Sequence, residues 1–594
     1  MKLGKDNTIQ MKWATAVKYL LLALLPVVAF YLMESYEHNP FAEVRPVAQI
    51  LNIILFECIG WFLYFLFGSS RCSIRTLLGL SMVFGLTNHY VMAFRSTPFV
   101  PWDIYSIGTA ASVANNYDFT PTKRVVIVTL VFLALAGLAQ FVDLKLSVRK
   151  RWQLRLGGSV GFLAGLITLT NLVQVDSLQT KWSLYPYLFT PAYMTKVNGM
   201  ALTFAMDLEY LVVEKPTGYS AAKAEQTLEE YTTEIATEED EYPNIIVIMD
   251  EAFSDLAVLG DFEASEDYMP FIHSLEEGYE NTITGYANVS VCGGNTANSE
   301  FEFLTGNSMY FLPVGSIPYQ QYLTGETESL PNYLKSLGYV TYGQHPYYAS
   351  GWKRETVYEW LGLDNTTFIY DYPYRSFLRK YVDDESSFET IIYTYEHKEE
   401  GTPMFLFNVT MQNHGSYYDL YDNFTPTITV DGVSSTSLSQ YLSLLKETDA
   451  AFENLIDYFS GVDEKTVIVF FGDHQPNNSV AYYIQALNGI DSNNLTTEEN
   501  EARYKVPFVI WANYDIEEGT EQETSLNYLA SEVLTVAGVP TSPYMNFLLD
   551  LREYYPIISA VRLEENADVS EDEAEEMLLL YQQLQYYNLF DWEE

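Results

Sequence analysis

Five long apolar runs in the first third of the chain constrain its fold more than any other feature. Each approaches the length of about 20 residues that an α-helix needs to cross a bilayer. The runs are residues 13–32, 46–67, 74–94, 125–142 and 156–175. We therefore expect a five-helix transmembrane domain over residues 1–175.

The positions of the cations predict the orientation of these spans. Lys and Arg in short loops stay on the cytoplasmic side of a membrane. With the N-terminus inside, ten Lys and Arg lie in cytoplasmic segments, against four in outside loops, which are Arg45, Arg95, Lys123 and Arg124. An odd number of spans then places everything after about residue 176 outside the cell. The first run lacks a small-residue cleavage site and is followed by four more spans, which argues against a cleaved signal peptide.

Charge and cysteine content restrict the partners of the outer part. Residues 1–175 contain 15 Lys and Arg against 8 Asp and Glu, whereas residues 176–594 contain 17 against 70. So acidic a domain repels nucleic acid, which we exclude as a ligand.

Of the three cysteines, only Cys292 lies outside, so the outer domain has no intramolecular disulfide. This favours the surface of a single-membrane bacterium.

Two further regions follow the spans. Residues 176–242 combine amphipathic stretches with a Pro-Gly turn and a polar helical pattern, and predict a helical linker at the membrane surface. In residues 243–594, short apolar runs alternate with helical patterns. The strand-like runs are 244–249, 339–343, 404–409, 466–471 and 506–513, and the helical ones include 329–337, 437–459 and 525–537. This alternation predicts an extracellular α/β domain with a mostly parallel central sheet covered by helices on both faces. The acidic stretch 567–594 predicts a helix that packs back on this domain.

Three short clusters follow or lie between the predicted strands of this domain. They are Asp250-Glu251, Thr296 after two glycines and an asparagine, and Asp473-His474. Each has a simpler explanation alone: an acidic pair at a helix start, a helix N-cap, and a turn. Together they offer the carboxylates that a hard divalent cation needs, one imidazole, and a hydroxyl that the cation would activate. The glycines also let a helix start approach an anion closely. We interpret the set as a metal site with a nucleophile for phosphoryl-type transfer.

These clusters, with Trp352-Lys353-Arg354 and Asn413-His414, resemble the alkaline phosphatase and sulfatase superfamily. With its five spans and linker, the chain resembles the lipoteichoic acid synthases, which transfer glycerol phosphate. The resemblance implies that Glu251, Thr296, Asp473 and His474 hold one Mn2+ or Mg2+ and that Thr296 is the nucleophile. It also implies that four residues bind the phosphate and glycerol of the substrate, namely His345, Trp352, Arg354 and His414.

The implied reaction moves glycerol phosphate from phosphatidylglycerol to an acceptor at the bacterial cell membrane. The acceptor is a glycolipid primer, a growing polyglycerol phosphate chain or a surface polysaccharide. Two departures from the family change the charge beside the phosphate: Asn295 stands where several synthases carry a lysine, and Asp250 adds a carboxylate.

Four other functions compete with this one. A sulfatase requires x-Pro-x-Arg after its modified residue, and Cys292 is followed by Gly-Gly-Asn-Thr, which excludes it. A two-metal phosphatase requires a second ligand set near these motifs, which the sequence does not offer. A phosphoethanolamine transferase shares the spans and the Thr nucleophile but typically has disulfides in its outer domain. It remains the enzymatic alternative, and a catalytically dead membrane sensor is the non-enzymatic one.

Overall fold

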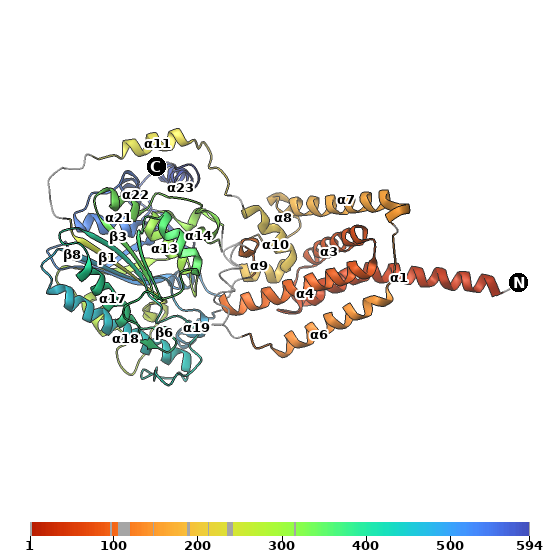
Figure 1. Ribbon diagram of the computed structural model, residues 1–594, viewed down its shortest axis with the longest axis horizontal. Coiled ribbons are helices and arrows are strands. Elements are labelled where there is room, and N and C mark those ends of the chain that lie inside the picture. The colour runs from red at the N-terminus through yellow and green to blue at the C-terminus, as the bar shows by residue number, and fades with distance from the viewer. Residues whose placement is uncertain are drawn as a thin grey trace. The chain divides into compact units, whose positions relative to one another are not determined.

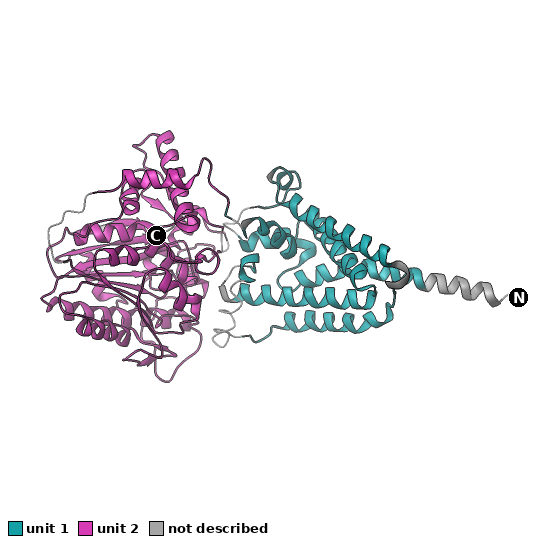
Figure 2. Cartoon of the chain, turned by 45° about the horizontal axis from the view of Figure 1, so that its top comes forward, with its two compact units in different colours: residues 1–104, 114–213 teal, residues 105–113, 214–594 magenta. Residues whose placement is uncertain are grey.

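The computed structural model describes residues 3–95, 98–104, 119–146, 148–186, 191–211, 213–233, 242–313, 316–492 and 494–592. The chain forms two compact units, which Figure 2 distinguishes by colour. The first comprises residues 1–104 and 114–213, and the second comprises residues 105–113 and 214–594. The predicted linker is therefore divided between the two units.

The first unit contains a long helix at each of the five apolar runs (Figure 1). They are α1 (Leu3–Glu34), α3 (Pro46–Phe67), α4 (Ser70–Arg95), α6 (Lys123–Leu138) and α7 (Val148–Val173). Among the described residues, four segments are long and apolar enough to cross a membrane: Thr15–Glu34, Pro46–Phe67, Lys123–Phe141 and Trp152–Val173.

Helix α4 is as long as the others but more polar. Its Ser73 hydroxyl donates to the Gly60 carbonyl at 2.7 Å, and its Asn88 side-chain oxygen accepts from the Phe99 amide at 2.9 Å. Both side chains are buried. Because the Ser73 hydroxyl and the Asn88 side-chain oxygen are hydrogen-bonded inside the unit, the helix can bury both groups among apolar neighbours.

The second unit is built on an eight-stranded sheet in the order β10-β2-β9-β8-β1-β7-β3-β4. The strands are β1 (Asn244–Asp250), β2 (Thr282–Asn288), β3 (Val340–His345), β4 (Asn365–Phe368), β7 (Met404–Val409), β8 (Thr466–Gly472), β9 (Lys505–Ala512) and β10 (Gly519–Ser525). Strand β9 is antiparallel to both of its neighbours, and every other pair in the sheet is parallel. The predicted mostly parallel sheet is thus confirmed.

Helices cover both faces of the sheet, as predicted (Figure 1). On one face, Ile246, Ile248 and Phe470 belong to a core formed with α12 (Pro270–Glu276), α17 (Asp384–His397), α18 (Thr436–Ser460) and α19 (Asn478–Leu487). On the other face lie α13 (Thr296–Thr305) and α21 (Leu526–Ala537). There the ring of Phe303 lies 5.9 Å from that of Phe407 and 5.0 Å from that of Phe471. Alternate side chains of the buried strands thus serve two separate cores.

The acidic C-terminal stretch forms α23 (Glu571–Phe590), which packs on α22 (Pro543–Arg552) and α11 (Ala221–Glu230). Their shared core includes Ala224, Phe547, Tyr581 and Leu584. Gln583 donates to the Thr217 carbonyl at 2.6 Å. Gln585 exchanges two hydrogen bonds with the backbone of Ser308, at 2.8 and 2.9 Å. The helix therefore packs back on the domain, as predicted, and fixes the loop that follows α13.

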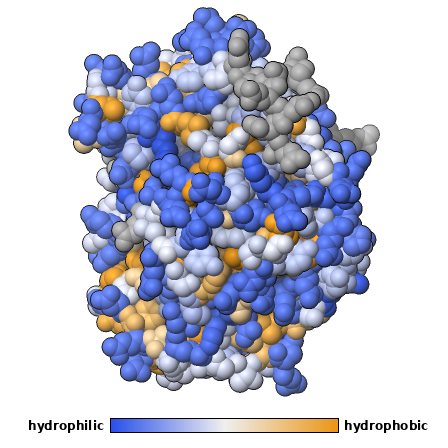
Figure 3. Space-filling view, turned by 90° about the vertical axis from the view of Figure 1, so that its left-hand side faces the viewer, coloured by the Kyte–Doolittle hydropathy of each residue, from blue (hydrophilic) through white to orange (hydrophobic). Residues whose placement is uncertain are grey.

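The remaining elements are short. Helical ones are α2 (Pro40–Glu43), η1 (Pro101–Ile104), η3 (Ala139–Phe141), α8 (Asp176–Lys181), α9 (Pro191–Asn198), α10 (Met200–Asp207), η4 (Leu208–Leu211), η5 (Leu256–Leu259), η6 (Met309–Phe311), α14 (Pro318–Gln321), α15 (Leu330–Ser336), η7 (Gly351–Lys353), α16 (Arg354–Trp360) and α20 (Thr497–Ala502). Two hairpins are formed by β5 (Phe377–Leu378) with β6 (Tyr381–Val382) and by β11 (Ile557–Ile558) with β12 (Leu563–Glu564). Figure 3 shows one face of the molecule, on which hydrophilic side chains prevail.

Candidate active site

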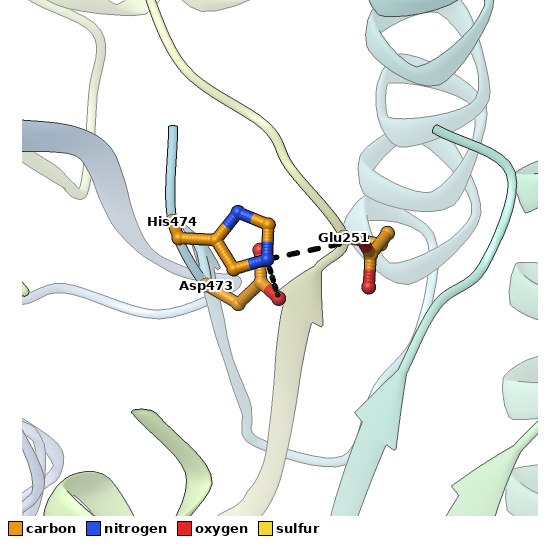
Figure 4. A group of neighbouring side chains, drawn as sticks. All are labelled: Glu251, Asp473 and His474. Atoms are coloured by element: carbon orange, nitrogen blue, oxygen red, sulfur yellow. Dashed lines mark ion pairs between the residues drawn. The ribbon is translucent and has the colours of Figure 1, made fainter. Parts of the chain in front are cut away.

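Three potential metal ligands meet where two neighbouring strands end. Glu251 follows β1, and Asp473 and His474 follow β8; the two strands are parallel, with Asp250 opposite Gly472. Their ligand atoms all lie within 4.8 Å of one another (Figure 4). His474 Nε2 lies 3.3 Å from Asp473 Oδ2 and 3.9 Å from Glu251 Oε1. The structure thus brings together three of the four predicted ligands.

Two atoms of this cluster are buried without a hydrogen-bond partner in the described part of the chain, Asp473 Oδ2 and His474 Nε2. The other ends of the same side chains are engaged: Asp473 Oδ1 accepts from the Ala252 amide at 2.7 Å, and His474 Nδ1 lies 3.0 Å from the Gln475 carbonyl. Burial, together with the charge of Asp473, raises the pKa of Glu251 well above its ordinary value. Buried carboxylate and imidazole atoms that lack a hydrogen-bond partner fit a divalent cation. Such a cation would offset the repulsion between the carboxylates of Glu251 and Asp473.

Thr296 is the fourth predicted ligand and begins helix α13. Its hydroxyl donates to Glu251 Oε2 at 3.3 Å, and the residue is 7% exposed. The turn before it has positive φ at Gly293 (+74°), Gly294 (+147°) and Asn295 (+68°), which glycine adopts readily. The Ser299 hydroxyl donates to the Asp473 carbonyl at 2.6 Å, which ties α13 to the metal-ligand loop. The predicted nucleophile therefore lies in the cluster.

The glycine before Asp473 is required by close packing. A Cβ atom at Gly472 would lie 1.9 Å from the Phe253 carbonyl oxygen, so no larger residue fits there without moving the backbone. Because Gly472 has no Cβ, the end of β8 can lie directly against the Phe253 backbone in the loop after β1. The two ligand-bearing loops are therefore packed directly on each other.

Asp250 orients the cluster through hydrogen bonds to the segments that carry its ligands. Its carboxylate accepts from the Thr410 hydroxyl at 3.0 Å and from Asn413 at 2.9 Å, and its carbonyl accepts from the Asp473 amide at 3.0 Å. Thr410 in turn accepts from the Glu251 amide at 3.0 Å. Asp250 thus orients both carboxylate ligands through their backbone.

Two of the predicted substrate residues, His345 and Arg354, contact each other. Arg354 Nη1 lies 3.0 Å from His345 Nε2, and both residues are buried. Arg354 also forms a two-pronged ion pair with Glu300, with Nε 3.0 Å from Oε1. Tyr358 donates to the other oxygen of Glu300 at 2.8 Å. Glu300, one helical turn after Thr296 on α13, was not predicted, because nothing in its spacing separates it from a surface glutamate.

The other two predicted substrate residues lie in loops of the same domain. His414 follows β7, with Nδ1 2.8 Å from the Gly415 carbonyl and 3.0 Å from the Tyr381 hydroxyl. Burial lowers the pKa of His414 to about 4. Trp352 is half-buried in η7 with φ +54°, a strained backbone for a residue with a side chain.

The three site histidines share one arrangement. Nδ1 of His345 lies 2.9 Å from the Val409 carbonyl, and Nδ1 of His414 and of His474 also faces a carbonyl. Because a carbonyl only accepts, a neutral ring in this arrangement carries its proton on Nδ1 and its lone pair on Nε2. For His345, that lone pair accepts from Arg354. In His414, Nε2 has no hydrogen-bond partner among the described residues, which makes it the free base of the three.

Glu302 is a buried carboxyl outside the cluster, and it should make the stability of the fold depend on pH. Burial raises the pKa of Glu302 from 4.5 to about 7, although Ser290, Ser308 and Met309 donate to it. The folded state therefore holds this proton between about pH 4.5 and 7 while the unfolded state loses it. Stability should fall as pH rises through this window, by on the order of 3 kcal/mol at most.

Replacement of Glu302 by glutamine should remove this fall, because the amide does not ionise. We expect the melting temperature of Glu302→Gln to rise relative to wild type between pH 5 and pH 8, measured by thermal unfolding of the full-length protein. Glu453→Gln, at an exposed position on α18, is the matched control. The prediction would be contradicted if the melting temperatures of Glu302→Gln and wild type differed by the same amount at pH 5 and pH 8.

Residues 243–539 match the model of the sulfatase family. Over 425 residues, the chain is 30% identical to a putative cyclic beta-1,2-glucan modification protein of Rhizobium meliloti (strain 1021), covering 70% of this chain and 65% of that one. It is 25% identical over 385 residues to lipoteichoic acid synthase 1 of Bacillus subtilis (strain 168), covering 61% and 57%. The chain spans less than two thirds of the length of either relative.

Two solved structures share the fold. The Streptococcus pyogenes phosphoglycerol transferase GacH, in complex with sn-glycerol-1-phosphate, has a TM-score of 0.51 at 20% identity, covering 63% of this chain and 95% of that one. The Neisseria meningitidis integral membrane protein lipooligosaccharide phosphoethanolamine transferase A (EptA) has a TM-score of 0.51 at 13% identity, covering 88% and 95%. At these identities the likeness shows the fold alone.

Proposed function

The chain belongs to the sulfatase family, and on that premise we propose that it transfers glycerol phosphate from phosphatidylglycerol to a cell-envelope acceptor through Thr296. The observation that carries the proposal is the Thr296 hydroxyl 3.3 Å from Glu251. It lies within a buried cluster in which Asp473 Oδ2 and His474 Nε2 have no hydrogen-bond partner in the described part of the chain. A hydroxyl in that position is suited to nucleophilic attack. The residues present fit a Mn2+ or Mg2+ ion, which Glu251, Thr296, Asp473 and His474 would hold.

In the first half of the reaction, Thr296 Oγ1 forms a bond to the phosphodiester phosphorus. The bond from phosphorus to the diacylglycerol oxygen breaks, that oxygen takes up the proton that the Thr296 hydroxyl gives up, and diacylglycerol leaves. Glycerol phosphate remains on Thr296 as a phosphodiester. A divalent cation held by these residues would supply positive charge at the site and would favour the deprotonated hydroxyl of Thr296. Thr296 lies at the start of α13, and a helix start favours an anion beside it.

In the second half, the hydroxyl of the acceptor attacks the phosphorus and Thr296 leaves with a restored proton. We assign the proton transfer to His414, since Nε2 of His345 is occupied by Arg354 and that of His474 belongs to the metal cluster. His345, Trp352 and Arg354 would contact the phosphate and glycerol. Because Glu300 neutralises Arg354, this arginine acts on the phosphate by hydrogen bonds more than by net charge.

Phosphatidylglycerol is preferred to phosphatidylethanolamine as the donor on two grounds. One relative is a lipoteichoic acid synthase, and its similarity extends over 61% of this chain. In addition, all cysteines of the described residues are free, so the outer unit lacks the disulfides expected of a phosphoethanolamine transferase. The acceptor would be a glycolipid or a polyglycerol phosphate chain, and the N-terminus would be cytoplasmic with the catalytic unit outside the cell.

The test is turnover of phosphatidylglycerol with a fluorescent headgroup by the purified full-length protein, with Mn2+ added or chelated. We expect metal-dependent release of diacylglycerol from this lipid and not from phosphatidylethanolamine. Release from phosphatidylethanolamine alone would instead make the chain a phosphoethanolamine transferase. A protein that cleaves neither lipid would contradict both assignments.

A further inference from the structure

The hairpin formed by β5 and β6 holds the loop that carries His414. Arg379, at the turn of this hairpin, is 5% exposed. Its Nη2 donates to the carbonyls of Gln412 and His414 at 2.7 and 2.8 Å, and its Nη1 donates to the carbonyl of Ser416 at 3.1 Å. One planar guanidinium thus binds three carbonyls on both sides of the candidate base.

No carboxylate among the described residues forms an ion pair with Arg379, so it differs from Arg354. Its charge lies instead against two aromatic rings, with Cζ 5.4 Å from the ring centre of Tyr417 and 5.8 Å from that of Tyr381. Its backbone has φ +55°. Burying an unpaired cation on a strained backbone costs stability. A lysine would carry the same charge but could not span three carbonyls, so the arrangement depends on the fork of arginine.

Tyr381, on β6 of the same hairpin, contacts the ring of His414. Its hydroxyl lies 3.0 Å from His414 Nδ1 and donates to the Gly415 carbonyl at 3.3 Å. The two ring centres are 5.2 Å apart. The hairpin therefore fixes both the backbone and the ring of His414.

We propose that Arg379 and Tyr381 are positioning residues that hold residues 412–416 and the ring of His414, so that Nε2 of this histidine is the proton-transferring atom. Neither residue belongs to the predicted set of ligands or substrate contacts. The inference rests on the proposed function, because His414 needs positioning only if it takes part in the transfer.

The test is a double-mutant cycle between Arg379→Lys and His414→Gln, measured with phosphatidylglycerol and Mn2+. We expect Arg379→Lys alone to lower kcat by about 30-fold with little change in KM, since a positioned proton-transfer group contributes about 100-fold or more. In the His414→Gln background the same change should cost less than about 3-fold, because residues that act as one unit are not additive. Equal costs in both backgrounds would overturn the proposal.

Two further variants distinguish a loss of positioning from a folding defect. Tyr381→Phe removes one oxygen and should lower kcat, again only while His414 is present. Arg375→Lys is the matched control, since this exposed arginine in the same segment bonds the Ile369 carbonyl and should stay within about 2-fold of wild type. Loss of activity in Arg375→Lys equal to that in Arg379→Lys would contradict a specific role for the hairpin contact.

Hydrogen exchange separates this inference from the proposed function. We expect faster deuterium uptake in peptides covering residues 410–418 in Arg379→Lys than in wild type or Arg375→Lys, measured on the full-length protein. Unchanged exchange would show that Arg379 does not hold the loop. If the wild type cleaves neither lipid, the proposed function fails, and the exchange measurement still decides whether the hairpin restrains the His414 loop.

Discussion

Replacement of Thr296 by alanine should lower turnover of phosphatidylglycerol by at least about 10⁴-fold, since loss of a nucleophile removes most of the catalysis that a site provides. The hydroxyl lost is the one that donates to Glu251 in the buried cluster. Alanine fits the start of a helix interior without a clash, so the cost in stability should be less than about 2 kcal/mol. The measurement is release of diacylglycerol, with the melting temperature recorded on the same sample.

Thr305→Ala is the matched control for this prediction. Thr305 is also a buried threonine of α13, but its hydroxyl donates to the Phe301 carbonyl at 2.6 Å, within the helix. Its replacement should lower stability without abolishing turnover. Mass spectrometry of wild-type protein quenched during turnover should find glycerol phosphate on the peptide that contains Thr296. Full activity of a folded Thr296→Ala protein would end the case for a covalent mechanism.

Replacement of Asp473 by asparagine should weaken Mn2+ binding by at least about 100-fold and abolish turnover with it, as expected when a metal site loses a ligand. The change leaves the side-chain volume almost unaltered, yet it removes the charge of a carboxylate whose Oδ2 has no hydrogen-bond partner in the described residues. The oxygen of the introduced amide could still accept from the Ala252 backbone N–H, as Asp473 Oδ1 does, so the loop should keep its shape.

Calorimetry with Mn2+ measures this loss directly. A saturating cation should also stabilise the wild type, by about 2.7 kcal/mol at a concentration of 100 times Kd, and should not stabilise Asp473→Asn. Asp457→Asn, on the outer side of α18, controls for the removal of one negative charge from an acidic domain. Undiminished Mn2+ binding by Asp473→Asn would refute the predicted ligand set.

The strands that carry the site could be predicted because they are buried on both faces. Strand β7 was predicted with the bounds that the structure shows, since residues 404–409 are almost wholly apolar and all buried. Strand β10 was missed, because its seven residues contain no large apolar side chain and it lies at the edge of the sheet. The clustering of Glu251, Asp473 and His474 followed from parallel strands ending at one edge.

The contacts that support the site could not be predicted. Glu300 meets Arg354 and Arg379 meets the His414 loop only after segments 54 and 33–37 residues apart have folded together. Local sequence gives no sign of such pairs, because an isolated arginine or glutamate most often lies at the surface. The contacts of Asp250 beside the cluster could not be predicted either. Its neighbour Glu251 has the same charge, and only the pleat of the strand end directs the two side chains to different partners.

Helix α11 has a consequence for how the chain resists proteolysis before the second unit. Residues 222–224, Ala-Lys-Ala, resemble a site for proteases that cut after small residues, but they lie inside this helix, and Ala224 is buried against α22 and α23. A protease binds its substrate as an extended strand. Cleavage at this sequence would therefore require α11 to unwind and leave its apolar neighbours first. The sequence is therefore protected from such cleavage for as long as α11 stays packed against the C-terminal helix.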